Sequence, residues 1–304
     1  MPAGSEIPCG LFKGLLYFYA MGRVWLIAEA GATKTSWAFV DEGKVQVFKT
    51  RGINPNYLDD GALSHRIKEV VHLVPRQPDY VRFLGAGISN AHTEKRVKSA
   101  LHQYWPDADT EVGHDMLGAA MALCGRESGV ACILGTGTNA CAFDGVRITH
   151  KVMAPGYLLG DEGAGSWLGK NVLADFLRQR VPHSLSEILE QKFELNEKII
   201  LEQVYQKPEP GKWMAQFAAP LQEIRNEPYV QLLLEKGFTL FVENYLLPIP
   251  VSKSYPIHFT GSVACGFQDE LSRILHRFQL QPGRFLPDPL MPLVSYFTNQ
   301  KHVS

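Results

Sequence analysis

Two short apolar runs, each followed by glycines and threonines, stand out along the chain. Val24–Ala28 leads into Glu29-Ala30-Gly31-Ala32-Thr33-Lys34, and Val130–Leu134 leads into Gly135-Thr136-Gly137-Thr138. A second apolar run follows each of these segments. Short apolar runs bounded by turn residues are typical of buried strands. The pattern therefore predicts two β-hairpins, whose tips we name the first tip loop (residues 31–34) and the second tip loop (residues 135–138).

The remaining periodicity predicts further strands and helices around the hairpins. Each hairpin continues into a third strand, the second through Asp144-Gly145, which is a two-residue turn signal. Apolar spacing of three and four residues predicts helices over 62–74 and 93–105, with Thr93 as the N-cap of the latter. The other expected strands are 45–50, 81–84, 110–113, 147–151 and 256–260, and the other expected helices are 116–124, 166–178, 185–192, 197–204, 213–217, 229–247 and 289–299.

This order of elements predicts an α/β protein whose second half repeats the first. The repeat is strand, tip loop, strand, turn and strand, and Gly125–Gly129 interrupts the pattern between the halves. We expect an N-terminal extension over residues 1–21, a first domain over 22–116 and a second domain over 117–304 with a helical insertion. The last helix is a candidate to return to the first domain.

Composition excludes several classes of function. The chain has 304 residues, of which 45% are hydrophobic and 20% are charged, and this is enough to build two domains. The net charge of -1 provides no global basic field, so we expect neither nucleic acid nor a membrane surface as a partner. No apolar run reaches the roughly 18 to 20 residues that span a bilayer. The five cysteines form no C-x-x-C pair, which favours reduced thiols, a cytoplasmic location and the absence of an iron–sulfur site.

The first twenty residues have two interpretations. Gly10–Ala20 is apolar like a secretory segment, but Glu6 precedes it, without a lysine or arginine, and Lys13 interrupts it. We expect either that Met21 is the natural start or that residues 1–20 form an unstructured extension.

The two tip loops are candidates for phosphate binding. Glycine allows a ligand to approach the backbone closely, and backbone N–H groups and threonine hydroxyls suit phosphate oxygens. Glu29, two residues before the first tip loop, places a carboxylate where Mg²⁺ would be expected. Ordinary polar surface turns would have the same composition, so the loops alone leave both interpretations open.

Three other segments carry candidate chemistry. Asp115 follows a strand and precedes a helix, where aspartate is also a common N-cap. Gly160-Asp161-Glu162-Gly163 places two acids between glycines, and such a pair needs polar partners if it is buried. Gly261-Ser262 lies between a strand and a helix, which brings backbone N–H groups toward a ligand.

Together these segments resemble the BadF/BadG-type ATPase family of the actin/hexokinase/Hsp70-like superfamily, in particular its N-acetylglucosamine kinase-like branch. The tip loops correspond to that superfamily's phosphate-1 and phosphate-2 loops, and the resemblance covers Val24 to about Asn299. One departure is that Glu29-Ala30-Gly31 stands where the family has Asp-Gly-Gly or Asp-Ser-Gly. The resemblance implies two ribonuclease-H-like domains, the actin-like ATPase fold, with a cleft between them.

The resemblance also implies a role for each candidate residue. ATP, Mg²⁺ and a small-molecule sugar would be the ligands, and the reaction would be transfer of phosphate to the 6-hydroxyl of an amino sugar, most closely N-acetylglucosamine. Asp115 would be the general base and Glu29 the metal-binding group. Asn54, Asp115 and Asp161 would contact the sugar. The nucleotide-binding residues would be Gly31, Thr33, Lys34, Gly135, Thr136, Gly137, Thr138, Gly261 and Ser262.

Two other functions stay open at this point. An activating ATPase of a dehydratase, also in this family, holds an iron–sulfur cluster between subunits through paired cysteines, whereas the cysteines here are scattered. A sugar- or nucleotide-sensing protein with weakened catalysis would fit the change at Glu29-Ala30, but it would not need Asp115. Such families are often dimeric, which leaves a homodimer open.

Overall fold

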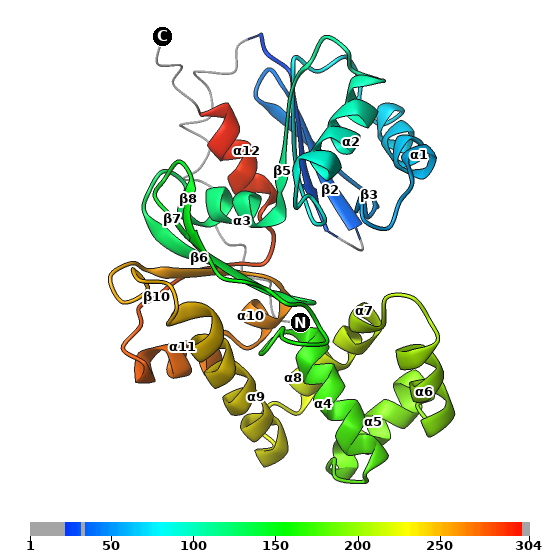
Figure 1. Ribbon diagram of the computed structural model, residues 1–304, viewed down its shortest axis with the longest axis vertical. Helices are drawn as coiled ribbons and strands as arrows, with labels where there is room; N and C mark the ends of the chain where they lie inside the picture. The colour runs from blue at the N-terminus through cyan, green and yellow to red at the C-terminus, as the bar shows by residue number, and fades with distance from the viewer. Residues whose placement is uncertain (1–21, 32–33, 300–304) are drawn as a thin grey trace, which may run out of the picture. The chain divides into compact units, whose positions relative to one another are not determined.

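The computed structural model describes residues 22–31 and 34–299, which form two compact units with one mixed β-sheet each (Figure 1). The first unit holds the described residues up to Gly118 together with those from Leu290 onward, and the second unit holds Ala119–Pro289. The division falls close to the expected boundary between residues 116 and 117, and the last helix belongs to the first unit. The expected extension over residues 1–21, with the alternative start at Met21, lies outside the described residues, as does Thr33.

The sheet of the first unit has the strand order β3-β2-β1-β4-β5. Strands β1, β2 and β3 form an antiparallel meander, and β4 and β5 run parallel to β1. Their bounds are β1 Trp25–Ala30, β2 Lys34–Asp41, β3 Lys44–Arg51, β4 Tyr80–Gly85 and β5 Asp109–His114.

The second unit repeats this topology. Its sheet has the order β10-β9-β6-β7-β8, with an antiparallel meander β6–β8 and two parallel strands beside β6. The predicted repetition is therefore confirmed, although β10 was not predicted because Pro282–Leu286 is short and begins with proline and glycine, which are unusual in strands. The bounds are β6 Gly129–Leu134, β7 Thr138–Phe143, β8 Ile148–Lys151, β9 Ile257–Thr260 and β10 Pro282–Leu286.

Helices cover both faces of the first sheet. Leu63 and Ile67 of α1 and Val97 and Leu101 of α2 pack on one face, while α12 packs on β1 and β2. The bounds are α1 Asp60–Val71, α2 Ala91–His102, α3 Asp115–Cys124 and α12 Leu290–Thr298. Helix α2 begins earlier than predicted, because the side chain of Asn90, not Thr93, caps it by accepting the N–H groups of His92 and Thr93.

Helix α12 is held to the first sheet by a buried arginine. The Arg82 guanidinium lies 5.3–6.0 Å from the ring centroids of Trp25, Tyr80 and Phe297, the last of these on α12. It also pairs with Asp109 at 3.0 Å, so its charge is compensated. This contact explains why the C-terminal helix belongs to the first unit.

The second unit carries the predicted helical insertion between β8 and β9. It ends with α9 and a π-helical turn, η2, where one continuous helix was predicted over 229–247. The four-residue loop 144–147, closed by Asp144, replaces the predicted two-residue turn between β7 and β8. The helices of this unit are α4 Gly165–Leu177, α5 His183–Phe193, α6 Glu197–Tyr205, α7 Pro210–Ala215, η1 Gln216–Ala218, α8 Pro220–Glu223, α9 Pro228–Phe241, η2 Val242–Leu246, α10 Ser262–Gly266 and α11 Gln268–Arg277.

The cysteines of the described chain are reduced thiols. Cys124, Cys132 and Cys141 are buried in the second unit, and Cys265 is half-buried. Burial raises the pKa of Cys124 and of Cys141 to about 12, so both thiols stay protonated and unreactive at neutral pH. A search of the described residues for a helix both long and apolar enough to cross a membrane finds none.

His258 on β9 should make the stability of the second unit depend on pH. The ring is buried, and its Nδ1 accepts the backbone N–H of Arg284 at 2.9 Å. Burial first, and then the charge of Arg284, lower the pKa of His258 against a small opposing effect of Glu127. The unfolded chain therefore takes up this proton more readily than the folded chain as pH falls below about 6.5. Stability should fall there, by at most about 1.4 kcal/mol per pH unit for this one group.

Thermal unfolding between pH 7.5 and pH 5 measures this effect. His258→Asn keeps an acceptor for the Arg284 N–H and should flatten the pH dependence, whereas replacing the exposed His150 by asparagine should leave it unchanged. Equal pH dependence in wild type and His258→Asn would show that another group is responsible.

Candidate active site

The second tip loop is a tight connection between β6 and β7. Leu134 pairs with Thr138, and the Gly135 N–H donates to the carbonyl of Gly137 at 3.1 Å. The loop also lies on the first turn of α4, because the N–H groups of Gly165 and Ser166 donate to the carbonyls of Gly135 and Thr136. Two of the helix N–H groups that have no partner within α4 are thus used to fix the loop.

Asp161 supports the second tip loop from within the unit. Its Oδ1 accepts the Thr138 N–H at 2.9 Å, and its Oδ2 accepts the Ser166 hydroxyl at 3.2 Å. The residue is 7% exposed, and burial raises the pKa of its carboxyl group while these two hydrogen bonds oppose the shift. Asp161 therefore braces the loop, and its predicted contact with a sugar stays a prediction.

The residues of the second tip loop differ in their exposure to solvent. Thr138 is buried, and its hydroxyl donates to the carbonyl of Glu162 at 3.1 Å, while Thr136 is exposed. A Cβ atom on Gly137 would lie 3.0 Å from the Asp161 carboxylate, a tight contact, so glycine favours this close approach. Thr136 and Gly137 are thus the members best placed to donate to a phosphate, and Thr138 orients them.

Gly261 and Ser262 lie beside Gly135 of the second tip loop, and their predicted contact with a nucleotide stays a prediction. A Cβ atom on Gly261 would lie 2.5 Å from the carbonyl oxygen of Leu134 and 2.9 Å from the nitrogen of Gly135. Gly261 also has φ +117°, a conformation that favours glycine. The end of β9 and the end of β6 therefore meet backbone to backbone, and Ser262 is exposed next to them.

The first tip loop is described in part. The N–H of Gly31 donates to the carbonyl of Lys34 at 2.9 Å, and Lys34 is exposed. Glu29 is half-buried on β1 in register with Leu84, so its side chain points to the sheet face on which Leu84 meets α3. Glu29 and Lys34 thus place one carboxylate and one ammonium on the two strands next to the tip of this hairpin.

Asp115 lies at the carboxyl end of the parallel strands of the first unit. Ala30, Gly85 and His114 are in register across β1, β4 and β5, and Asp115 follows His114 directly. Its Oδ1 accepts the N–H of Met116 at 2.7 Å, and His114 Nδ1 accepts the N–H of Leu117 at 3.0 Å. The His114 side chain therefore caps the start of α3, and the carboxylate of the half-buried Asp115 is oriented by the first turn of the same helix.

Asn54 is buried in the loop that follows β3. Its Oδ1 accepts the N–H of Asn56 at 2.9 Å and is so close to Gly87 that a Cβ atom there would overlap it. Gly87 has φ +82° and follows β4, so Asn54 packs at the same carboxyl strand ends as Asp115. Gly87 was not recognised from the sequence, although its place in Gly85-Ala86-Gly87 after a strand was the available signal.

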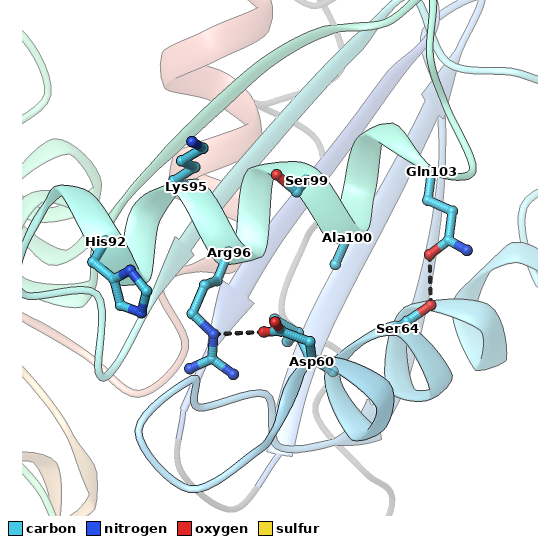
Figure 2. A pocket seen from close by; sticks show the side chains of 9 residues that line it. Asp60, Ser64, His92, Lys95, Arg96, Ser99, Ala100 and Gln103 are labelled. Atoms are coloured by element: carbon cyan, nitrogen blue, oxygen red, sulfur yellow. Dashed lines mark hydrogen bonds and ion pairs between the residues drawn. The ribbon is translucent and has the colours of Figure 1, made fainter.

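A separate hollow of about 390 Å³ lies between α1 and α2 and contains none of the predicted site residues (Figure 2). Arg96 spans it, pairing with Asp60 and donating to the carbonyls of Pro55 and Leu58 at 2.6 Å each. Arg96 therefore holds the segment that follows Asn54.

Glu29 is the candidate carboxylate for Mg²⁺ in the described part of the chain. Among residues 22–31 and 34–299, no three His, Cys, Asp or Glu side chains group as metal ligands. Mg²⁺ is commonly bound by one or two carboxylates together with substrate phosphates and water. Glu29 at the end of β1 is compatible with that arrangement.

Comparison with known proteins identifies the fold. The two repeated sheets with paired hairpins define an actin-like ATPase fold. A crystal structure of a Porphyromonas gingivalis protein described as a "putative N-acetylglucosamine kinase" is 36% identical over 90% of this chain and 99% of its own, with a TM-score of 0.82. A Chromobacterium violaceum protein of the same description is 15% identical over 90% and 98% of the two chains, with a TM-score of 0.66. A ROK family glucokinase from Streptomyces griseus, in complex with glucose and AMPPNP, is 14% identical over 89% and 97%, with a TM-score of 0.56, and like the second it supports the fold alone.

The first of these similarities establishes the family. The chain belongs to the BadF/BadG-type ATPase family, within its N-acetylglucosamine kinase-like branch. No protein-family model matches the chain, and no curated protein matches it.

Proposed function

We propose that this protein is an ATP-dependent kinase that phosphorylates the 6-hydroxyl of an amino sugar, most specifically N-acetylglucosamine. The observation that carries the proposal is the 36% identity over 99% of the Porphyromonas gingivalis protein, which is described as a "putative N-acetylglucosamine kinase". The positions of the candidate residues, at strand ends in each unit, support it.

The proposed chemistry is phosphoryl transfer from ATP to a sugar hydroxyl. The sugar hydroxyl loses its proton to Asp115 as its oxygen attacks the γ-phosphorus of ATP, and the bond from that phosphorus to the bridging oxygen breaks to release ADP. The Met116 N–H fixes the orientation of the Asp115 carboxylate. Thr136, Gly137, Gly31 and Lys34 hold phosphate oxygens, and Thr33, outside the described residues, is assigned to them on the resemblance alone.

The remaining assignments belong to the same proposal. Gly261 and Ser262 lie against the nucleoside, and Asn54 and Asp161 bind sugar hydroxyls. Mg²⁺, held by Glu29, phosphate oxygens and water, would offset charge on the phosphates. A cytoplasmic location agrees with the use of ATP and with the buried thiols. A homodimer and the absence of nucleic-acid and membrane partners stay predictions.

Release of ADP from Mg-ATP tests the proposal across a panel of sugars. The kcat/KM for N-acetylglucosamine should be at least tenfold higher than for glucosamine, N-acetylmannosamine or glucose. ADP release with N-acetylglucosamine should also be at least tenfold faster than the basal rate without sugar. A preference for another sugar would change the assigned substrate but would still support kinase activity. Binding of ATP or sugar without turnover on any sugar would instead support the sensing function, with Glu29-Ala30 as its cause.

A further inference from the structure

Tyr245 connects the helical insertion of the second unit to the segment beneath the second tip loop. It lies on η2, the π-helical turn that extends α9, and is 1% exposed. The N–H of Leu247 donates to the carbonyl of Val242 at 2.9 Å, which is the hydrogen bond of a π-turn. Such turns are rare and often occur at functional sites, and the sequence pattern gave no sign of this one.

Two consecutive residues of η2 hold the turn Gly160–Gly163, which we name the acidic turn. The Tyr245 hydroxyl accepts the N–H of Asp161 at 3.1 Å, and Asn244 donates to the Glu162 carboxylate at 2.9 Å. A Cβ atom on Gly160 would lie 2.8 Å from the Tyr245 hydroxyl, so the turn and the ring fit closely.

The acidic turn needs such support because its backbone is strained. Asp161 has φ +59°, a conformation that costs a non-glycine residue about 1 kcal/mol. Strain of this kind persists where surrounding contacts fix it. Tyr245 supplies the acceptor for the N–H of this residue, which would otherwise be buried without a partner.

The side chain of Asp161 connects the acidic turn to the second tip loop. The carboxylate of Asp161 accepts the Thr138 N–H and the Ser166 hydroxyl, and the Thr138 hydroxyl donates to the Glu162 carbonyl. One continuous set of hydrogen bonds therefore runs from η2 through the acidic turn to the residue next to Gly137.

We propose that Tyr245 and Asn244 are positioning residues for the second tip loop, acting through Asp161 and Glu162 and without touching the nucleotide themselves. The inference rests on the proposed function for its catalytic consequence. It assigns to the helical insertion a role in holding the phosphate-binding backbone in the geometry that ATP requires.

Tyr245→Phe tests the proposal, with Tyr229→Phe as a matched control. Tyr229, on α9, is half-buried, and its hydroxyl donates to Asp175 of α4 at 3.0 Å. Loss of one buried acceptor is worth about a factor of ten. Tyr245→Phe should therefore raise the KM for ATP about tenfold, and Tyr229→Phe should leave it within twofold.

Hydrogen exchange of the Thr138 and Asp161 amides gives a readout that does not depend on activity. Both amides should exchange at least fivefold faster in Tyr245→Phe than in wild type or Tyr229→Phe. Unchanged exchange, or equal acceleration in both variants, would overturn the proposal. Failure of wild type to bind ATP would refute the proposed function, and the exchange data would still decide whether Tyr245 fixes the loop.

An exposed position provides a second variant should Tyr245→Phe fold poorly. Asn244→Asp sets a second carboxylate against Glu162 and should raise the KM for ATP about threefold at low ionic strength, with the effect declining in salt. Glu243→Gln, an exposed change on the same turn, is its control. An unchanged KM in Asn244→Asp would count against the role of η2.

Discussion

Replacing Asp115 by asparagine should lower kcat by a factor of about 10²–10⁴ while leaving sugar affinity within about threefold. Asparagine keeps the shape of the side chain and an oxygen for the Met116 N–H, so the start of α3 is preserved. It cannot accept the proton of the attacking hydroxyl. Turnover and sugar binding, measured by ADP release and by calorimetry, should therefore separate in this variant.

Asp59→Asn is the control for this experiment. Asp59 caps α1 in the same unit by accepting the Ala62 N–H at 2.7 Å, and asparagine caps equally well. It should match wild type in stability and kcat. If Asp115→Asn kept turnover within threefold of wild type, the assignment of the general base would be wrong.

Replacing Gly261 by alanine should reduce both stability and ATP affinity. The added Cβ would lie 2.5 Å from the Leu134 oxygen and 2.6 Å from its carbonyl carbon, and the residue would also have to adopt φ +117°. Strain and overlap together should cost about 3 kcal/mol of stability. Because the overlap is with the backbone that begins the second tip loop, ATP affinity of the folded protein should fall at least tenfold.

Two other glycines of the second unit separate these effects. Gly156 has φ +82° with nothing within 4 Å, so Gly156→Ala should cost only the strain of about 1 kcal/mol. Gly145 has φ +96°, and a Cβ atom there would overlap the Arg126 carbonyl oxygen, at the end of the β6–β7 hairpin opposite the second tip loop. Gly145→Ala should match Gly261→Ala in lost melting temperature and keep wild-type ATP affinity at a temperature where it is folded. Equal loss of affinity in both would show that Gly261 acts through general stability alone.

The sequence was most informative where apolar runs meet glycine. Val24–Ala28 and Val130–Leu134 predicted the first strand of each sheet, and the glycines after them marked the two hairpin tips that the structure contains. Residues at strand ends, such as Asp115 and Gly261, were also located correctly, because a change from apolar to polar composition marks a strand end directly.

The residues that hold the candidate site in place were much harder to predict from the sequence. Tyr245 follows the apolar spacing of α9, and nothing in that spacing shows that its hydroxyl meets Asp161, which is 84 positions away in the sequence. For Asp161, two adjacent acids between glycines indicated a need for polar partners, but which of the two would point inward depends on the left-handed conformation of one residue. Contacts between distant elements set these details, and local pattern does not encode them.

The product of a reaction with N-acetylglucosamine and Mg-ATP tests the central claim most directly. Carbon and phosphorus NMR of the mixture should show one phosphomonoester, with phosphorus coupling at C6 of the sugar and one equivalent of ADP. Phosphate released without a sugar ester, or an ester at any other carbon, would contradict the account.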